Sequence, residues 1–374
     1  MSKASNGSMG RVVVTGGAGY IGSHTVLALR DAGWDVVIVD DLSTGSLHLV
    51  PKGVPLRIGN AGNSAFMATV FTETRPDAVI HFAGSISVPE SVERPLKYYN
   101  NNFANTCRLV ETCLAAGVGK FIFSSTAAVY GIPETQPVTE NSPLRPINPY
   151  GRSKLMAEEM LKDTAAANAF RYVALRYFNV AGADPKGRAG QVAKNSTNLI
   201  KVVSELAAGR RSGMTVYGDD YATEDGTCIR DFIHVSDLAD AHVSALSYLM
   251  EGGESEVMNC GYGEGYSVAR VLSEASKIVG QSLPFTIGPR RAGDPAQVVS
   301  DPSRIRDRLS WVPRYADLDL ILQAVHFNPL AGIRRLSFRD GDPGDPTAEM
   351  LGRMGCEAAP ATTDFEHMIS RLEL

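Results

Sequence analysis

Tyr150 and Lys154 stand four residues apart and carry the two side chains of this sequence best suited to moving a proton. This i, i+4 spacing places the phenol and the ammonium on one face of a helix, and Pro149 suits the start of that helix. Thr126 supplies a hydroxyl at the end of an apolar run, 120–123, that is typical of a buried strand. These three groups suit the removal of an alcohol proton while a hydride leaves the carbon.

The phenol can act as a base only if it loses its proton near neutral pH. Its reference pKa of about 10 must fall by roughly three units, which is about 4 kcal/mol of differential stabilisation. We expect Lys154 and a positively charged hydride acceptor to favour the phenolate, and Thr126 to hydrogen-bond the substrate oxygen or relay the proton. A Tyr-x-x-x-Lys pair alone is common on protein surfaces, so this interpretation depends on a cofactor site in the same chain.

A glycine-rich turn near the N-terminus supplies the predicted cofactor site. Gly16, Gly19 and Gly22 follow the apolar run 12–14, and Asp40 closes a second apolar run. The glycines let the backbone approach a pyrophosphate, which the N-terminus of the following helix attracts. The carboxylate of Asp40 can accept hydrogen bonds from a ribose diol and would repel a 2′-phosphate. The pattern therefore predicts NAD rather than NADP.

Composition narrows the class of protein. The chain of 374 residues has room for two lobes, and its 44% hydrophobic and 21% charged content is ordinary for a globular protein. A net charge of −5 disfavours nucleic acid as a partner. The sequence shows no apolar run of membrane-spanning length and no signal-peptide core near its start. The five cysteines lack metal-ligand spacing, so we expect no metal site, reduced thiols and a cytoplasmic location.

The order of apolar runs and amphipathic segments predicts an α/β fold with a doubly wound parallel sheet of Rossmann type. Short, nearly continuous apolar runs alternate with helical patterns through the first half of the chain. Strands are expected at 11–15, 35–39, 54–58, 78–82, 119–124 and 171–177, and helices at 20–32, 64–74, 91–116 and 150–168.

A smaller, discontinuous α/β substrate-binding domain is expected beside the sheet. Gly, Pro and charged residues multiply after Gly182, and strand and helix patterns then return before the sequence loosens again. Two lobes built this way would leave a cleft above the carboxyl ends of the strands. We assign 11–182 to the NAD-binding domain with 231–261 returning to it, 183–230 and 262–326 to the substrate-binding domain, and 327–374 to a tail of unknown role.

A series of short segments resembles the extended short-chain dehydrogenases, and among them the UDP-galactose 4-epimerases. The similarity runs from about residue 11 to residue 320, and its motifs are specific as an ordered series rather than one by one. The matching segments are 16–23, 81–84, 98–102, 123–131, 149–154, 175–179, 221–227, 230–234 and 289–295.

The resemblance implies reversible interconversion of UDP-galactose and UDP-glucose, by oxidation at C4 to a 4-keto sugar and re-reduction with a tightly bound NAD. Tyr150, Lys154 and Thr126 would be catalytic, and the helices predicted at 91–116 and 150–168 would pair across a homodimer. Expected at NAD are Gly16, Gly19, Tyr20, Ile21, Gly22, Asp40, Asn60, Ala61, Phe82, Ala83, Gly84, Asn101, Lys154 and Tyr177. Expected at the UDP-hexose are Thr126, Tyr150, Phe178, Asn179, Asn198, Leu199, Tyr217, Arg230, Arg291 and Asp294.

Three places depart from the family's pattern. Asn60 and Ala61 stand where the family usually has Asp and Ile at the adenine, although the Asn60 amide can still hydrogen-bond. Ile86 replaces a lysine that many relatives carry near the nicotinamide ribose. Val298 stands where relatives carry either a tyrosine or a small residue, so N-acetylated sugars stay open as substrates.

Other functions are open at this point. An epimerase of another nucleotide sugar (a UDP-N-acetylhexosamine, UDP-pentose or UDP-uronate) would share these motifs. A 4,6-dehydratase would need an acid after the strand-end hydroxyl, where this chain has Ala127 and Ala128. A non-catalytic NAD-binding scaffold is expected to lose the tyrosine or the lysine. A net oxidoreductase would release NADH and need external NAD.

Overall fold

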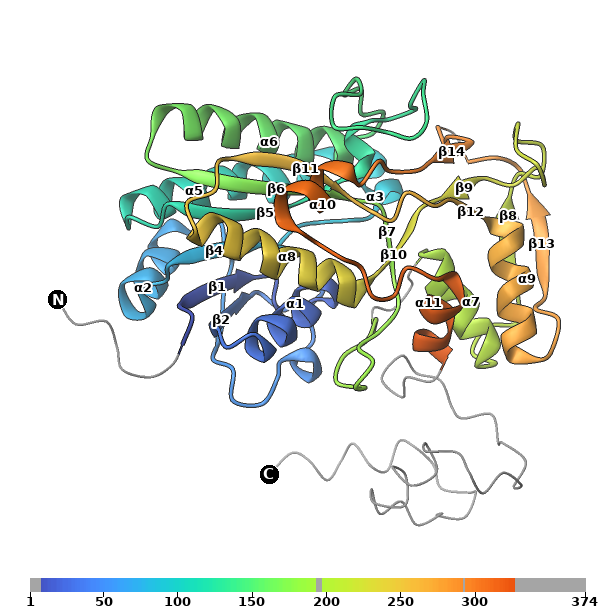
Figure 1. Ribbon diagram of the computed structural model, residues 1–374, viewed down its shortest axis with the longest axis horizontal. Coiled ribbons are helices and arrows are strands. Elements are labelled where there is room, and N and C mark those ends of the chain that lie inside the picture. Colours follow the sequence, from blue (N-terminus) through green and yellow to red (C-terminus); the bar gives the residue numbers. More distant parts are fainter. Residues whose placement is uncertain (1–7, 193–196, 292, 327–374) are drawn as a thin grey trace, which may run out of the picture. The chain divides into compact units, whose positions relative to one another are not determined.

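The computed structural model describes residues 8–192, 197–291 and 293–326, and the tail predicted for 327–374 lies outside them. Within these residues seven strands form one parallel sheet in the order β11-β6-β5-β4-β1-β2-β3 (Figure 1). The chain runs from β1 outward to β3, and then from β4 outward in the other direction, which confirms the predicted doubly wound sheet. The strands are β1 (Arg11–Thr15), β2 (Asp35–Asp40), β3 (Leu56–Ile58), β4 (Ala78–His81), β5 (Lys120–Thr126), β6 (Arg171–Tyr177) and β11 (Glu256–Cys260).

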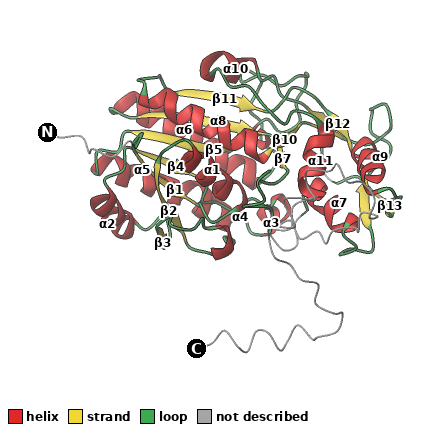
Figure 2. Ribbon diagram, turned by 60° about the horizontal axis from the view of Figure 1, so that its bottom comes forward, coloured by secondary structure: helices red, strands yellow, loops and turns green. Residues whose placement is uncertain are grey.

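Helices cover both faces of this sheet (Figure 2). Along β1, Val12 and Val14 pack into the same apolar cluster as Val26, while Val13 packs into a second cluster with Met67. Because both faces are buried, the strands read as continuous apolar runs rather than as alternating ones. On the first face lie α1 (Tyr20–Asp31) and α8 (Val235–Met250), and on the second α2 (Ser64–Thr74), α5 (Asn105–Ala115) and α6 (Pro149–Ala167).

The single helix predicted for 91–116 is instead a series of shorter segments. Pro95 has no N–H to donate and disfavours helical geometry at the residue before it, and Arg94 accordingly has φ −131° and ψ 60°. The series consists of α3 (Val88–Glu93), α4 (Pro95–Tyr98), a π-helical segment η2 (Tyr99–Ala104) and α5. The prediction of one continuous helix was therefore wrong, and η2 carries Asn101, which the sequence places at the cofactor.

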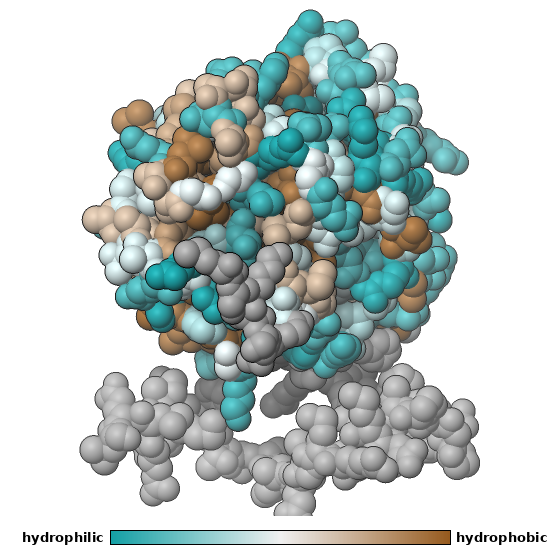
Figure 3. All heavy atoms as spheres, turned by 60° about the vertical axis from the view of Figure 1, so that its left-hand side comes forward, coloured by the Kyte–Doolittle hydropathy of each residue, from teal (hydrophilic) through white to brown (hydrophobic). Residues whose placement is uncertain are grey.

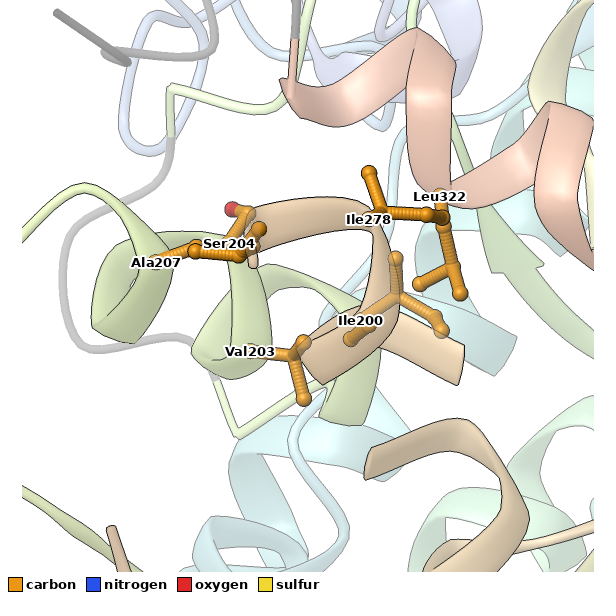
Figure 4. Close-up of a pocket in the computed structure, with 8 residues that line it drawn as sticks. Ile200, Val203, Ser204, Ala207, Ile278 and Leu322 are labelled. Atoms are coloured by element: carbon orange, nitrogen blue, oxygen red, sulfur yellow. The ribbon is translucent and has the colours of Figure 1, made fainter. Parts of the chain in front are cut away.

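The remaining described elements form small sheets and a helical group. The sheets are β7 (Asn179–Ala181) with β10 (Phe232–His234), β8 (Met214–Tyr217) with β13 (Phe285–Gly288), and β9 (Ile229–Arg230) between β12 (Tyr266–Ser267) and β14 (Gln297–Val298). The helices are α7 (Leu199–Ala207), α9 (Val268–Val279), α10 (Ser303–Leu309) and α11 (Leu318–His326), with short turns at η1 (Leu47–Leu49) and η3 (Ala127–Val129). Ile200, Ile278 and Leu322 bring α7, α9 and α11 together around an apolar hollow (Figure 4).

Candidate active site

The predicted site residues lie in a row along one edge of the main sheet, at the carboxyl ends of its strands. In sheet order, Tyr177 ends β6, Thr126 ends β5, Phe82 follows β4, Gly16 follows β1 and Asp40 ends β2. Neighbouring strands lie roughly 4.8 Å apart, so the edge from β6 to β3 spans about 24 Å. An edge of this length can hold an extended ligand.

Helix α6 brings the tyrosine and the lysine to the end of β5. Asn148 caps the helix, since its side-chain oxygen accepts a hydrogen bond from the Gly151 N–H at 2.9 Å, and Pro149 takes the first helical position. Tyr150 and Lys154 therefore lie in the first turns of α6, on the face toward the sheet. The structure confirms the helix that their spacing predicts.

Lys154 is held tightly within the protein. Its side chain is 3% exposed, and its Nζ donates a hydrogen bond to the Ser124 carbonyl at 2.8 Å and lies 4.8 Å from the centre of the Phe123 ring. Burial lowers the pKa of Lys154 to about 8, and the negative charge of Glu158 opposes that shift. The ammonium form is therefore close enough to its titration range to respond to neighbouring charges.

The pKa of the Tyr150 phenol differs from the expected one. Burial raises the pKa of its phenol, and a hydrogen bond with Thr126 acts in the opposite direction. Lys154 is not among the groups that lower this pKa, so the protein's own side chains do not produce the depression that a base needs. Thr126 itself is 8% exposed, and its Oγ1 accepts a hydrogen bond from the Ala128 N–H at 3.1 Å.

The glycine turn after β1 is closely packed on one side and uncapped at the helix that follows. Gly16 has φ +72°, and a Cβ there would lie 2.6 Å from the Ala83 nitrogen, so any other residue would push the strand ends apart. Helix α1 begins after Gly19 with no side chain capping it and no acid in its first turn, within the described residues. These free N–H groups and the helix dipole suit a phosphate anion, so the turn fits the pyrophosphate of NAD.

Asp40 ends β2 and accepts a hydrogen bond from the glycine turn, and it is the residue predicted to bind a ribose of the cofactor. One carboxylate oxygen accepts the Ala18 N–H at 2.9 Å, and the other accepts the Leu42 N–H at 2.9 Å. Burial raises the pKa of Asp40, while these backbone hydrogen bonds act against the shift. Each carboxylate oxygen can accept more than one hydrogen bond, so capacity for a ribose diol is left.

The other predicted cofactor residues hold one another in place. The Tyr20 hydroxyl donates to the Gly182 carbonyl at 2.7 Å, and the Phe82 ring lies 4.7 Å from that of His242. The Tyr177 hydroxyl is hydrogen-bonded to Ser124. Ile21 and Gly22 lie in the first turn of α1. Ala61 is a buried residue of the loop that follows β3.

Two asparagines and the loop after β4 complete this half of the site. The Asn60 Oδ1 accepts the Gly62 N–H at 2.7 Å, and Asn101 donates to the Ser85 hydroxyl at 3.0 Å. A Cβ at Gly84 would lie 3.6 Å from the Lys154 Nζ, which brings this loop directly beside the lysine. Among the predicted cofactor residues, Gly84 thus lies beside Lys154.

A second group of predicted residues gathers around β8, β9 and the loop before β14. Arg230 forms an ion pair with Asp294, and the Arg291 guanidinium lies 3.9 Å from the centre of the Tyr217 ring. The Asp294 N–H also donates to the Arg291 carbonyl at 3.1 Å. The structure therefore brings four of the ten residues predicted at the sugar nucleotide into one cluster, in which the Tyr217 ring already carries a cation on one face.

The remaining sugar-nucleotide residues have structural contacts of their own. Phe178 and Val298 are buried in one apolar cluster with Tyr130. Asn179 begins β7. Asn198 caps α7, and its Nδ2 donates to the Val180 carbonyl at 2.8 Å. Leu199 is the first residue of that helix.

Two further groups of site residues were missed by sequence reasoning. Asn102 is 1% exposed, and its side chain binds both the N–H of Ser85, at 2.7 Å, and the Ser153 hydroxyl, at 3.1 Å. Glu158 and Arg176 form a buried ion pair directly behind Lys154. The spacing of Glu158, four residues after Lys154 on the same helical face, was the signal that could have found it.

A comparison with known protein families identifies the family of this chain. A family model described as the NAD dependent epimerase/dehydratase family matches residues 12–261. The chain belongs to this family. The resemblance expected from the ordered motifs is thereby confirmed, and NAD is the cofactor that the family's description gives.

Members of the NAD dependent epimerase/dehydratase family with high similarity to this chain are named as 4-epimerases of UDP-sugars. A UDP-glucose 4-epimerase of Azospirillum brasilense is 53% identical over 90% of this chain and 95% of its own. The crystal structure of the UDP-glucose 4-epimerase of Brucella ovis in complex with NAD is 44% identical, with a TM-score of 0.83 over 87% of this chain and 99% of that one. The UDP-Glc/GlcNAc 4-epimerase of Campylobacter jejuni is 49% identical, with a TM-score of 0.74 over 84% and 97%.

Across the described ranges, no helix is both long enough and apolar enough to cross a membrane. Within the same residues, no group of three or more His, Cys, Asp or Glu side chains is arranged to bind a metal ion.

Proposed function

We propose that this protein interconverts UDP-galactose and UDP-glucose by inverting the configuration at C4 with a tightly bound NAD. The observation that carries the proposal is the convergence of Thr126, Tyr150 and Lys154 at the end of β5, on the same edge of the sheet as the glycine turn after β1. The names of the relatives described above agree with this reaction.

In this reaction NAD, when bound, supplies a reversible acceptor for the C4 hydride. Tyr150 takes the proton of the 4-hydroxyl group, and Thr126 hydrogen-bonds the same oxygen or relays the proton. The pKa of Tyr150 is not lowered by Lys154 alone, so we assign the stabilisation of the phenolate to Lys154 together with the positive nicotinamide of NAD when it is bound. The hydrogen bond to the Ser124 carbonyl keeps the Lys154 ammonium at the end of β5. In the return half of the cycle, Tyr150 gives the proton back to the oxygen on C4, and the sugar that forms has the opposite configuration at that carbon.

The remaining predicted residues are proposed to bind the two ligands. The glycine turn and the N-terminus of α1 would hold the pyrophosphate of NAD, and Asp40 would accept hydrogen bonds from a ribose and repel a 2′-phosphate. Arg230 and Arg291 would bind the pyrophosphate of the sugar nucleotide, for which a guanidinium fork is well suited. The site does not need a metal for these steps.

The domain division and the assembly are also proposed. The division at 11–182 with 231–261, against 183–230 with 262–326, is supported by the pairing of β11 with β6 and by the packing of α8 beside α1. We propose a homodimer formed through the outer faces of η2 and α6. The free thiols of the four described cysteines support a cytoplasmic location.

The first experiment mixes dialysed protein with UDP-galactose, adds no NAD and follows UDP-glucose in a coupled assay. Wild type is expected to convert the sugar with its resident cofactor. Tyr150→Phe is expected to lose about 10²–10⁴-fold in kcat, because the base is removed, while the NAD released on denaturation stays at the wild-type amount.

Tyr248→Phe is the matched control, since the Tyr248 hydroxyl on α8 accepts a hydrogen bond from the Glu254 N–H and its loss is expected to leave kcat unchanged. Substantial turnover by Tyr150→Phe would contradict the assigned base. If wild type converted neither UDP-galactose nor UDP-N-acetylgalactosamine even with NAD added, an epimerase of another nucleotide sugar or the non-catalytic scaffold would replace this proposal. A requirement for stoichiometric NAD would indicate a net oxidoreductase.

UDP-N-acetylgalactosamine belongs in a parallel assay. Val298 is smaller than tyrosine and packs against Phe178 in the cluster next to η3. A named UDP-Glc/GlcNAc 4-epimerase is also among the relatives. Conversion of both sugars would extend the proposed substrates to N-acetylated hexoses, and conversion of UDP-galactose alone would exclude them.

A further inference from the structure

Three consecutive residues at the end of β5 contact three residues on one face of α6. The Ser124 carbonyl accepts the Lys154 ammonium at 2.8 Å, and the Thr126 hydroxyl is hydrogen-bonded to Tyr150. Ser125, which lies between these two residues of β5, donates its hydroxyl to the carboxylate of Glu158, one turn beyond Lys154 on α6. The contact between Ser125 and Glu158 involves no group that the proposed reaction uses.

Glu158 is joined to more of the sheet than Ser125 alone. Its side chain is 3% exposed and accepts hydrogen bonds from the Arg176 guanidinium of β6, at 2.5 Å from Nη2 and 3.1 Å from Nε. Arg176 in turn donates to the Tyr130 hydroxyl at 3.1 Å, and that hydroxyl donates to Asn259 of β11 at 2.6 Å. One carboxylate thus connects α6 to three neighbouring strands of the sheet.

A buried ion pair needs a reason beyond stability. Removing two charges from water costs several kcal/mol per ion, and well-packed apolar residues often replace such a pair without loss of stability. Here the pair sits one helical turn beyond Lys154, and its carboxylate is opposite in charge to the ammonium. The position suits control of the catalytic lysine and of the helix that carries it.

Other ionisable groups around Lys154 do not supply this charge. His81 of β4 faces the ammonium, but burial lowers the pKa of His81 to about 3, so the ring is neutral in an assay. Burial raises the pKa of Tyr177 of β6 and of Tyr98 of α4, and both phenols stay neutral. Within the described residues, Glu158 is the anion that acts on Lys154.

We propose that Glu158 is a positioning residue for the epimerase reaction: with Ser125 and Arg176 it fixes the register of α6 against β5, and its charge keeps Lys154 in the ammonium form. This inference rests on the roles proposed above for Tyr150 and Lys154. A purely structural carboxylate would affect folding but would leave the pH dependence of the reaction unchanged.

The test measures kcat, KM and the alkaline limb of kcat/KM for four variants. In Glu158→Gln, the limb is expected to move about one unit toward lower pH, because Lys154 loses its proton more readily without the anion. Glu158→Asp restores the charge and is expected to restore the limb. Ser125→Ala removes only the contact between β5 and α6. Its kcat is expected to fall about tenfold or more, while the alkaline limb of kcat/KM stays at the wild-type pH. Glu73→Gln, 52% exposed on α2, is the matched control and should behave as wild type.

Two results would overturn the proposal. One is an unshifted alkaline limb in folded, NAD-containing Glu158→Gln. The other is a wild-type kcat in Ser125→Ala, which decides the matter if Glu158→Gln does not fold, because this variant leaves no unpaired charge. Tyr150→Phe separates this failure from failure of the proposed function. If Tyr150→Phe is inactive while Glu158→Gln and Ser125→Ala behave as wild type, only the role of Glu158 is wrong.

Discussion

Arg290 and Arg291 are adjacent in the chain but make different contacts. The Arg290 Nε donates to Asp220 at 2.6 Å, and its guanidinium lies 4.4 Å from the centre of the Tyr221 ring. Arg291 stacks on Tyr217 and, within the described chain, makes no ion pair. The guanidinium fork of Arg291 is therefore available for a phosphate, whereas that of Arg290 already has an anionic partner.

This difference predicts different effects on substrate binding. Arg291→Ala is expected to raise KM for UDP-galactose about 10–100-fold with a smaller effect on kcat, because a charge-assisted hydrogen bond to the pyrophosphate is lost. Arg290→Ala is the matched control and should leave KM within about twofold of wild type, since surface ion pairs contribute little. Initial rates in the coupled assay give both constants. An equal rise in KM for the two variants would contradict the assignment of Arg291.

At the scale of elements, the break at Pro95 changes which side chains reach the outer surface. Val92 of α3 and Leu96 of α4 are 64% and 75% exposed, and Met156 on α6 is 41% exposed. Tyr99 and Phe103 of η2 line a hollow with Met156. Figure 3, which brings the left-hand side of Figure 1 forward, shows hydrophobic residues most frequent at the upper left of that face, with smaller groups elsewhere on it. An apolar surface of this kind is typical of a protein–protein contact.

The proposed homodimer can be tested at this surface. Met156→Glu places a charge in the proposed contact, so it is expected to convert a dimer into a monomer in light scattering coupled to size exclusion. Val312→Glu changes a side chain that is 78% exposed and lies in the loop between α10 and α11, so it should leave the mass unchanged. A wild-type monomer, or a dimer in Met156→Glu, would count against the proposed interface.

Sequence patterns predicted the elements better than the contacts between them. Apolar runs identified β1, β2, β4, β5 and β6 because strands buried on both faces have no polar side, and the Tyr150–Lys154 spacing identified one face of α6. The Glu158–Arg176 pair could not be predicted in this way, because it depends on which strand lies beside α6. The pKa of Tyr150 was predicted to fall near Lys154, but burial raises it, which depends on neighbours that spacing alone does not reveal.

At the scale of the whole molecule, buried histidines couple stability to pH. Burial lowers the pKa of His81 and of His234 to about 3 and that of His242 to about 4, below the value of about 6.5 for an unfolded chain. Below pH 6.5 the unfolded chain binds protons that the folded protein does not. The free energy of unfolding therefore decreases as pH falls toward these folded values.

Urea denaturation between pH 7.5 and 5 measures this effect. Each of the three histidines is expected to contribute a loss of about 1.4 kcal/mol per pH unit below pH 6.5. His242→Gln should make the dependence shallower by one such contribution, whereas His48→Gln changes an exposed residue and should leave it as in wild type. A free energy of unfolding that does not vary with pH would contradict the neutral, buried state of these rings.

The place of β11 in the sheet has a consequence for how the chain is made. Strand β6 ends at Tyr177, and among the residues that the structure describes, its outer edge pairs with Glu256–Cys260. During translation the ribosome adds almost eighty residues between these two strands, and throughout that time the edge of β6 has open N–H and C=O groups. Open edges of this kind recruit other chains. A nascent or truncated chain that stops before Glu256 is therefore the form of this protein most in need of a chaperone.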